Sequence, residues 1–389
     1  MLKRGMEALV KTVLCIGMPL LVAVVPAYAG PGYVGSADLD GNGEVDYDDV
    51  LQLHKQWHTS GTGSGISYDS VLPQGRTLPG SQHGTTRGMK HFVDRADGIG
   101  PLTGVGYSQL ACQSCHTPNC HSCHAGNAQR QVATCFRCHS RQALNQNTLK
   151  LSDVHVTAGM ECVDCHTDSD LHGDGVERDS MLAGDIEIKC ASCHDIGQIA
   201  NPPLEHTLHA AKIDCSACHV QSVVTCYNCH YDTEINENRK INVGAQKNYL
   251  LLVNGRDNKI EAATYMALYY RGQAPTPAEG KSFVVYAPFY NHAVVGPGAR
   301  TCDDCHDNAN VRQIDSAGAL TMAGLAQSGV SVDHATGVIP IVDGVDYGFQ
   351  FFDHDGTTWV PAKTAIDQIQ FGFCSPLTQE QFNKLKTPH

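Results

Sequence analysis

The stretch Cys112-Gln-Ser-Cys115-His116-Thr-Pro-Asn-Cys120-His-Ser-Cys123-His124 contains one five-residue pattern, Cys-x-x-Cys-His, twice in close succession. Six further copies follow, so eight copies with two cysteines each use 16 of the chain's 18 cysteines. The copies are Cys112/Cys115/His116, Cys120/Cys123/His124, Cys135/Cys138/His139, Cys162/Cys165/His166, Cys190/Cys193/His194, Cys215/Cys218/His219, Cys226/Cys229/His230 and Cys302/Cys305/His306. The histidine is present in every copy, although zinc sites and thiol redox motifs do not require it.

This pattern is typical of c-type haem attachment, in which two thiols bond the porphyrin and the adjacent histidine ligates the iron. Zinc or disulfides are the alternative, but zinc ribbons space their Cys-x-x-Cys pairs more regularly than this chain does. The sequence therefore predicts eight covalent c-type haems. Seven of the motifs fall within residues 112–230, which leaves little room for regular structure.

Haem faces must then supply much of the apolar core in that region. We expect a mostly irregular fold, with short α-helices that carry the motifs around a packed haem array. We also expect a small β-rich part in the C-terminal half, where Asn254-Gly255 and Asp355-Gly356 stand between strand-like runs as hairpin signals. Thr378 and Gln381 have the spacing of a capping box that opens a last short helix.

Residues 1–29 have the features of a secretory signal peptide: a basic start, the apolar run 12–25 and the A-x-A site Ala27-Tyr28-Ala29. The apolar run is too short to span a bilayer comfortably, although an uncleaved anchor is the alternative. No later segment is apolar over 18 residues. We therefore expect an exported protein, periplasmic or extracellular, with no transmembrane segment after cleavage.

An acidic segment after the signal resembles an EF-hand-type calcium loop of the dockerin kind. Its candidate ligands are Asp38, Asp40, Asn42, Glu44, Asp46 and Asp49, and Gly43 permits the sharp turn. Calcium prefers this many oxygen ligands. Because dockerins carry two such loops and only one occurs here, a solvated acidic turn is the alternative. Ca²⁺ is the second predicted cofactor.

These features predict five parts of the chain. They are the signal peptide 1–29, the calcium segment 30–58, a flexible Gly/Ser-containing linker 59–80, an octahaem domain 81–310 with a β-rich insertion 240–290, and a small β-rich region 311–389. The formal net charge of −13 argues against nucleic acid and anionic membrane surfaces as partners.

The number of spare histidines matches the number of predicted irons. Outside the motifs, residues 66–310 contain His83, His91, His121, His155, His172, His206, His209 and His292. We predict that they fill the sixth iron positions and give bis-His sites, whose potentials lie below those of Met/His sites. His292, ten residues before Cys302, is the most natural partner of the eighth haem. Met89, Met160 and Met181 are alternative ligands.

With these motifs the chain resembles an octahaem member of the multihaem cytochrome c superfamily over roughly residues 81–310. The stretch 287–306 is similar to cytochromes of metal- and sulfur-respiring bacteria. The resemblance implies respiratory electron transfer, with redox proteins or extracellular electron acceptors as partners. Some extracellular relatives stack into conductive filaments, so self-association into a filament or oligomer is also implied.

The rival class is an octahaem reductase or oxidoreductase of the tetrathionate, hydroxylamine or nitrite type, with one open iron. No Cys-x-x-Cys-Lys motif occurs, and no motif singles out a catalytic tyrosine. Because an enzyme needs an exchangeable iron position, eight filled positions favour an electron carrier. We expect no catalytic residues, and one iron without a sixth ligand would reverse that choice.

Overall fold

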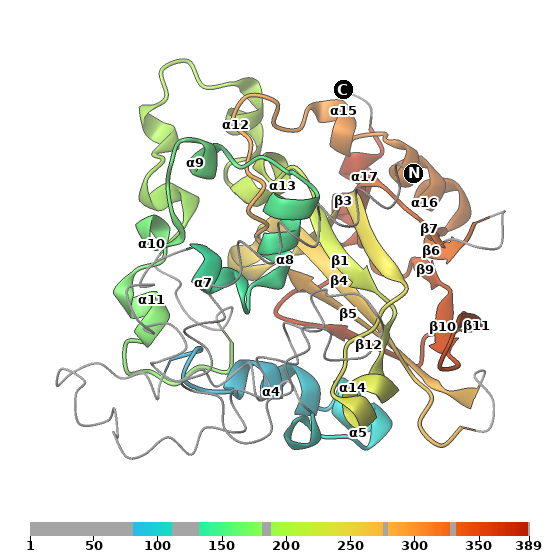
Figure 1. The fold of residues 1–389 in the computed structure, drawn as a ribbon. Coiled ribbons are helices and arrows are strands. Elements are labelled where there is room, and N and C mark those ends of the chain that lie inside the picture. The colour runs from blue at the N-terminus through green and yellow to red at the C-terminus, as the bar shows by residue number, and fades with distance from the viewer. Residues whose placement is uncertain (1–80, 111–131, 181–187, 275–278, 327–331, 388–389) are drawn as a thin grey trace, which may run out of the picture. The chain divides into compact units, whose positions relative to one another are not determined.

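The computed structural model describes residues 81–110, 132–180, 188–274, 279–326 and 332–387 (Figure 1). They all belong to the second of two compact units, which divide between Val71 and Leu72. The signal peptide, calcium segment, linker, first two motifs and His121 lie outside the described residues. Among those described, no helix is both long and apolar enough to cross a membrane.

Short helices make up the first half of the described chain, as the sequence predicted. They are α4 (Arg87–Asp94), α5 (Ile99–Thr103), η3 (Tyr107–Gln109), α7 (Val132–Phe136), α8 (Ser140–Ala143), η5 (Leu144–Thr148), α9 (Val154–Thr157), α10 (Cys162–Cys165), α11 (Asp168–His172), η7 (Cys190–Ser192), η8 (Ile196–Gln198), α12 (Leu204–His209) and α13 (Cys215–His219). Helices this short are marginal without tertiary support. Other contacts must therefore hold them in place.

The sheets are concentrated in the C-terminal half, also as predicted. The largest runs in the order β1 (Val223–Tyr227), β3 (Gly244–Asn254), β4 (Ile260–Tyr270), β5 (Lys281–Pro288) and β12 (Gln368–Phe371), while β2 (Cys229–His230) pairs with β4 and β8 (Gly337–Pro340) with β3. A second sheet has the strand order β7 (Val332–His334), β6 (Ala319–Leu325) and β9 (Asp346–Phe349). A third consists of β10 (Phe351–His354) and β11 (Trp359–Lys363). The remaining helices are η9 (Arg256–Asn258), α14 (Tyr231–Glu237), α15 (Cys302–Cys305), α16 (Ala309–Ala317) and α17 (Gln379–Leu385).

The local turn and cap signals are confirmed. Strands β3 and β4 form an antiparallel hairpin across Asn254-Gly255, and β10 and β11 form one across Asp355-Gly356. Gly255 is needed because a Cβ there would collide with the Glu261 carboxylate. The Thr378 hydroxyl accepts a hydrogen bond from the Gln381 backbone at the start of α17, as the capping box predicted.

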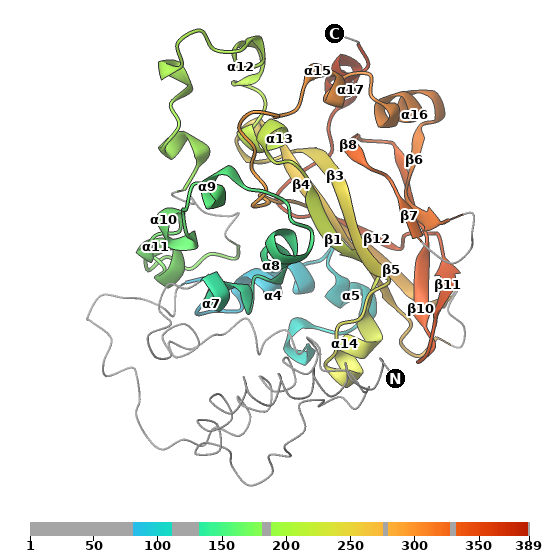
Figure 2. The ribbon, with the colours of Figure 1, turned by 45° about the horizontal axis from the view of Figure 1, so that its top comes forward.

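Two segments that the sequence separates belong to one sheet. Strand β8 lies beside β3, and β12 lies beside β5, both in parallel register. The C-terminal strands therefore complete the sheet that the 223–288 region begins. Figure 2 shows the green helices α7 to α11 to one side of these strands.

Apolar burial is unevenly distributed along the chain. The main core cluster belongs to the β-rich part and includes Leu250, Leu251, Tyr265 and Ile339, each at most 2 % exposed. In contrast, the described residues between 132 and 216 bury no apolar side chain. Six of the nine exposed large hydrophobic side chains lie there: Val154, Val156, Val176, Ile199, Leu204 and Leu208.

Candidate functional site

Every motif histidine in the described residues faces one histidine from outside the motifs. The pairs, with the distance between ring centroids, are His139–His83 at 6.1 Å, His166–His292 at 6.1 Å, His194–His155 at 6.0 Å, His219–His206 at 6.0 Å, His230–His354 at 6.1 Å and His306–His209 at 6.3 Å. Except for His206 and His219, which are 13 positions apart, these pairs join residues far apart in sequence. A recurrent spacing of this kind therefore indicates one shared geometric requirement.

That spacing is the one expected for two imidazoles on opposite sides of a metal ion. A metal–imidazole bond is about 2 Å long and the bonded nitrogen lies about 1 Å from its ring centroid, which gives centroids about 6 Å apart. A structural zinc site needs four protein ligands. Within the described ranges, no three His, Cys, Asp or Glu side chains converge as a metal site. Two axial histidines fit a porphyrin-held iron better, because the porphyrin supplies the other four ligands.

Several of the paired histidines are oriented by a backbone carbonyl. The Nδ1 atom lies 2.8 Å from the Val295 oxygen in His219 and 3.0 Å from the Lys384 oxygen in His306. Donation from Nδ1 leaves Nε2 free for a metal, which is the usual outer-shell arrangement of a histidine ligand. His83 makes the same contact with the Leu171 oxygen at 3.2 Å. Burial lowers the pKa of His83, which favours the neutral imidazole that a metal binds.

The motifs are carried as predicted in five of six described copies, since they lie on or next to α7, α10, η7, α13 and α15. The seventh departs from the prediction of short helices. Cys226 lies on β1, and Cys229 and His230 form β2. The β-branched run Val223-Val224-Thr225 favours a strand just before this motif. The seventh motif is therefore part of the sheet.

Cys138 of the third motif lies next to a helix and not on it. Helix α7 ends at Phe136, so the helix carries Cys135 but not Cys138, which lies in the turn that follows. The N–H groups of Cys138 and His139 both donate to the Cys135 oxygen, at 3.2 and 2.9 Å, and this closes the turn. The Cys138 side chain is exposed.

The physical reason for this exposure is the missing protein core around the third motif. Because the described residues 132–216 bury no apolar side chain, no protein core covers the Cys138 thiol. The same holds for Cys190 and Cys193 of the fifth motif, which are exposed as well. The haem attachment of these three cysteines stays a prediction.

Five of the eight histidines predicted from sequence face a described motif histidine: His83, His155, His206, His209 and His292. His91 stacks on Phe373 with centroids 5.3 Å apart, and its Nδ1 lies 3.7 Å from Asp179 Oδ2. His172 ends α11 and faces no described motif histidine. The motifs of His116 and His124 lie outside the described residues, as does His121, so this part of the prediction stays open.

The expected pairing of His292 with the nearest motif is wrong. His292 faces His166, whereas the eighth motif histidine, His306, faces His209 on α12. The reason is the path of the chain after β5. Val295 donates its backbone N–H to the His219 oxygen, and the Val294 N–H donates to Asp153, which hold this segment against the earlier motifs. Proximity in sequence did not determine proximity in space.

His354 is the ligand candidate that sequence reasoning missed. It lies outside residues 66–310, at the end of β10, and its ring centroid is 6.1 Å from that of His230. A hint was present in Asp353-His354-Asp355-Gly356, where a histidine stands at the mouth of the predicted hairpin. Its partner could not be inferred, because β10 reaches β2 only through tertiary packing.

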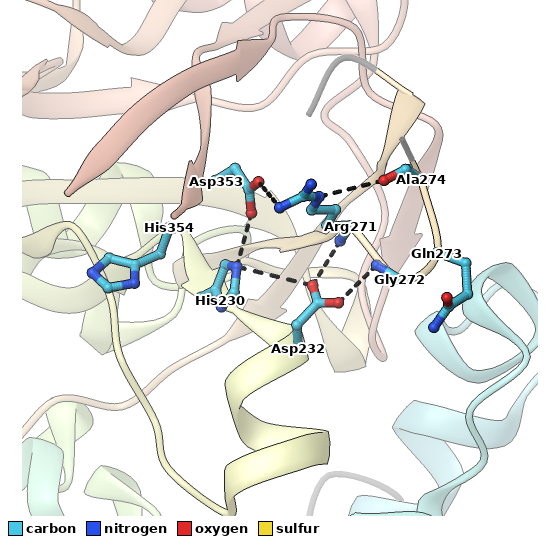
Figure 3. Close-up of a pocket in the computed structure, with 8 residues that line it drawn as sticks. All are labelled: His230, Asp232, Arg271, Gly272, Gln273, Ala274, Asp353 and His354. Atoms are coloured by element: carbon cyan, nitrogen blue, oxygen red, sulfur yellow. Dashed lines mark hydrogen bonds and ion pairs between the residues drawn. The ribbon is translucent and has the colours of Figure 1, made fainter. Parts of the chain in front are cut away.

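The seventh site differs from the others in its polar surroundings (Figure 3). His230 Nε2 lies 2.9 Å from Oδ1 of the buried Asp353. Asp353 Oδ2 lies 3.5 Å from Arg271 Nη1. A pocket of about 340 Å³ adjoins these groups and is lined by His230, Asp232, Arg271, Gly272, Gln273, Ala274, Asp353 and His354.

Neighbouring motifs contact one another in an order that departs from the sequence. His83 and His166 influence each other electrostatically, which places the third site beside the fourth. Cys165 is similarly close to Cys193, which links the fourth site to the fifth.

The fifth and sixth sites meet at Cys190 and Cys215, because each of these thiols shifts the pKa of the other, that of Cys190 upward and that of Cys215 downward. Helix α12 then links the sixth site to the eighth, because it carries both His206 and His209. The sites are therefore linked in the order third, fourth, fifth, sixth and eighth, while the seventh site lies in the sheet.

The donor set and the apolar surface together fit covalently bound haem. Motif cysteines lie beside the histidine pairs, and the surrounding helices expose aliphatic side chains such as Leu204 (67 %) and Leu208 (48 %) on α12. Exposed apolar patches of this kind mark binding surfaces for apolar groups. A porphyrin would cover such side chains and supply the missing core.

No protein-family model, curated protein or solved structure matches the chain. The functional argument therefore rests on its own residues.

Proposed function

We propose that the chain is an exported octahaem c-type cytochrome that carries electrons through closely spaced haems, most of them bis-His. Its partners are redox proteins or electron acceptors outside the cytoplasm. The observation that carries the proposal is the set of six histidine pairs, each with one motif histidine, at a nearly constant centroid distance of 6.0–6.3 Å. Chance packing of histidines would not select one motif member each time.

Bound haem would supply one-electron exchange at the iron. The chain's own residues would hold and orient it: the motif cysteines would bond its edge, and each histidine pair would supply two ligands to the iron. An iron with both of these ligands would exclude substrate, as an electron carrier requires. The two motifs outside the described residues have His91, His121 and His172 as candidate partners.

Two measurements on the purified protein test the proposal. Intact mass and the pyridine haemochrome spectrum should give eight haems per chain. Electron paramagnetic resonance of the oxidised protein should then show low-spin ferric signals that account for at least seven of them. Fewer than six haems, or predominantly high-spin iron, would refute this function.

A second candidate is favoured by the seventh site alone. There Asp353 lies on the His230 nitrogen that would bind iron, and Arg271 and Asp232 line the adjoining pocket. Cationic and acidic side chains beside an exchangeable iron position are what a reductase needs to bind an anion and deliver protons. One high-spin ferric haem that binds cyanide or nitrite, and whose signal is unchanged by His354→Ala, would support this second function. If no such haem is found, electron transfer remains the proposed function.

A further inference from the structure

We propose that two charged side chains, Arg300 and Asp153, give the haem array a direction, with the highest reduction potentials at the sixth and eighth haems. The proposal rests on the proposed function. It concerns a difference in reduction potential between the haems of the fourth and fifth sites and those of the sixth and eighth.

Arg300 is bound to the backbone of the sixth motif. Its Nη1 donates hydrogen bonds to the Ala217 oxygen at 3.3 Å, the Cys218 oxygen at 3.5 Å and the Val220 oxygen. Its Nη2 donates to the Gln221 oxygen at 2.7 Å. Its backbone N–H donates to the Cys218 oxygen at 3.1 Å. The guanidinium therefore lies at the end of α13, where unsatisfied carbonyls attract a cation.

The same arginine is also next to the eighth motif. It precedes Cys302 by two residues, and its charge acts on both Cys305 and Cys218. All the hydrogen-bond partners of its guanidinium are neutral carbonyls. Among the described carboxylates, Asp304 acts on it only through space and none forms an ion pair with it. A half-buried positive charge thus lies between two haem attachment sites.

Asp153 occupies the corresponding place between the fourth and fifth sites. It is 4 % exposed, and its Oδ1 lies 3.3 Å from Nδ1 of His155, the partner of His194 in the fifth pair. The same oxygen accepts the backbone N–H of His155, while Oδ2 accepts the N–H of Val294 at 2.9 Å. Val294 is two residues after His292, the partner of His166 in the fourth pair. One carboxylate therefore positions ligands at both sites.

The two charges act with opposite sign on a haem, because reduction adds one negative charge. A nearby cation stabilises the reduced form and raises the potential. A carboxylate on the ligand imidazole strengthens its donation to iron, stabilises the oxidised form and lowers the potential. Electrons that enter near the third site would accordingly accumulate at the sixth and eighth.

Spectropotentiometric titration of the intact holoprotein tests the direction. Arg300→Gln, which keeps a hydrogen-bond donor but removes the charge, should lower the two highest one-electron steps. The expected change is about tenfold in the ratio of reduced to oxidised haem at fixed potential, which equals about 59 mV. In Arg300→Lys, the ratio of reduced to oxidised haem at these two steps should stay within a few-fold of the wild-type ratio. Asp153→Asn should raise one or two of the lowest steps.

Arg239→Gln is the matched control, since it removes an exposed guanidinium that pairs with Glu237 and should move no step. The proposal is overturned if Arg300→Gln moves no step or only the lowest ones. It is also overturned if Arg300→Lys shifts the steps as much as Arg300→Gln, because lost hydrogen bonds would then be the cause. If Arg300→Gln fails to retain its haems, unchanged lowest steps in Asp153→Asn overturn the proposal, and raised ones support it.

Failure of this inference is distinguishable from failure of the proposed function. Eight haems with low-spin signals and unmoved potentials would remove only the directional bias. A wild-type protein with too few haems would remove both.

Discussion

Residues 132–216 and the β-rich part from 223 onward differ in what stabilises them. The first carries three of the six described motifs in full and buries no apolar side chain among its described residues. The second buries a continuous cluster of aliphatic and aromatic side chains, including Leu251, Tyr269 and Phe351. Since burial of apolar surface is the main stabilising contribution to folding, the two regions cannot be stable for the same reason. Under the proposed function the first would depend on bound haem, whereas the second depends on its own sequence.

The largest expected effect is that one region folds without haem and the other does not. When the chain is produced without haem, residues 132–216 should remain unfolded, while β3, β4 and β5 retain their hydrogen bonds. Amide hydrogen exchange should then differ between the regions by about a thousandfold or more, equal to about 4 kcal/mol. Equal protection in both regions would show that the helical part has a core of its own.

A core truncation should affect the β-rich part strongly. Leu251→Ala removes a fully buried side chain from β3 and should lower the free energy of unfolding by about 2–5 kcal/mol. Denaturant unfolding of the holoprotein, followed by tyrosine and tryptophan fluorescence, measures it. Leu325→Ala, which truncates a side chain 42 % exposed on β6, is the control and should change little.

Substitution of single histidines that face a motif histidine should test the same difference between the two regions, one haem site at a time. His209→Ala should convert one haem in eight to a high-spin spectrum and loosen α12, whose leucine side chains are exposed. His354→Ala should cause the same spectral change but leave the unfolding free energy nearly unchanged, because β10 is held by β11. His334→Ala removes a half-buried histidine that is hydrogen-bonded to the Lys247 backbone and faces no motif histidine among the described residues, and it should alter neither measurement. An unchanged spectrum in His354→Ala would mean that the seventh iron has another ligand.

The smallest expected effect should be the same in both regions. Thr378→Ala and Thr167→Ala each remove the N-cap side chain of a short helix, α17 and α11. Capping is a local interaction, so each should cost about 1 kcal/mol wherever the helix lies. Thermal unfolding with matched haem content measures both. A much larger cost at Thr167 would show that its helix has a wider role in positioning the haem sites.

The sequence predicted local features well because short-range chemistry determines them. The Asn254-Gly255 and Asp355-Gly356 turns, the Thr378 cap and the helical motifs all follow from a few adjacent residues. The seventh motif on β1 and β2 was missed, because the motif itself says nothing about the strand-forming run before it.

Histidine pairing could not be predicted for a different reason. His292 lies ten residues before Cys302 but faces His166, and His354 reaches His230 from the far end of the chain. These partners are brought together by sheet register and by contacts such as Asp153 with Val294. The number of distal histidine ligands stays a prediction from counting, whereas their assignment depends on tertiary contacts that no periodicity records.

Helix α12 links a local contact to a remote one. Its His206 faces a histidine only 13 positions later, at 219, whereas its His209 faces one at 306. The short loop can close at small entropic cost, and the helix it fixes then presents His209 in a set orientation. The eighth motif would therefore meet a partner that the sixth site has already positioned. One turn of helix in this way sets the order of assembly of two sites.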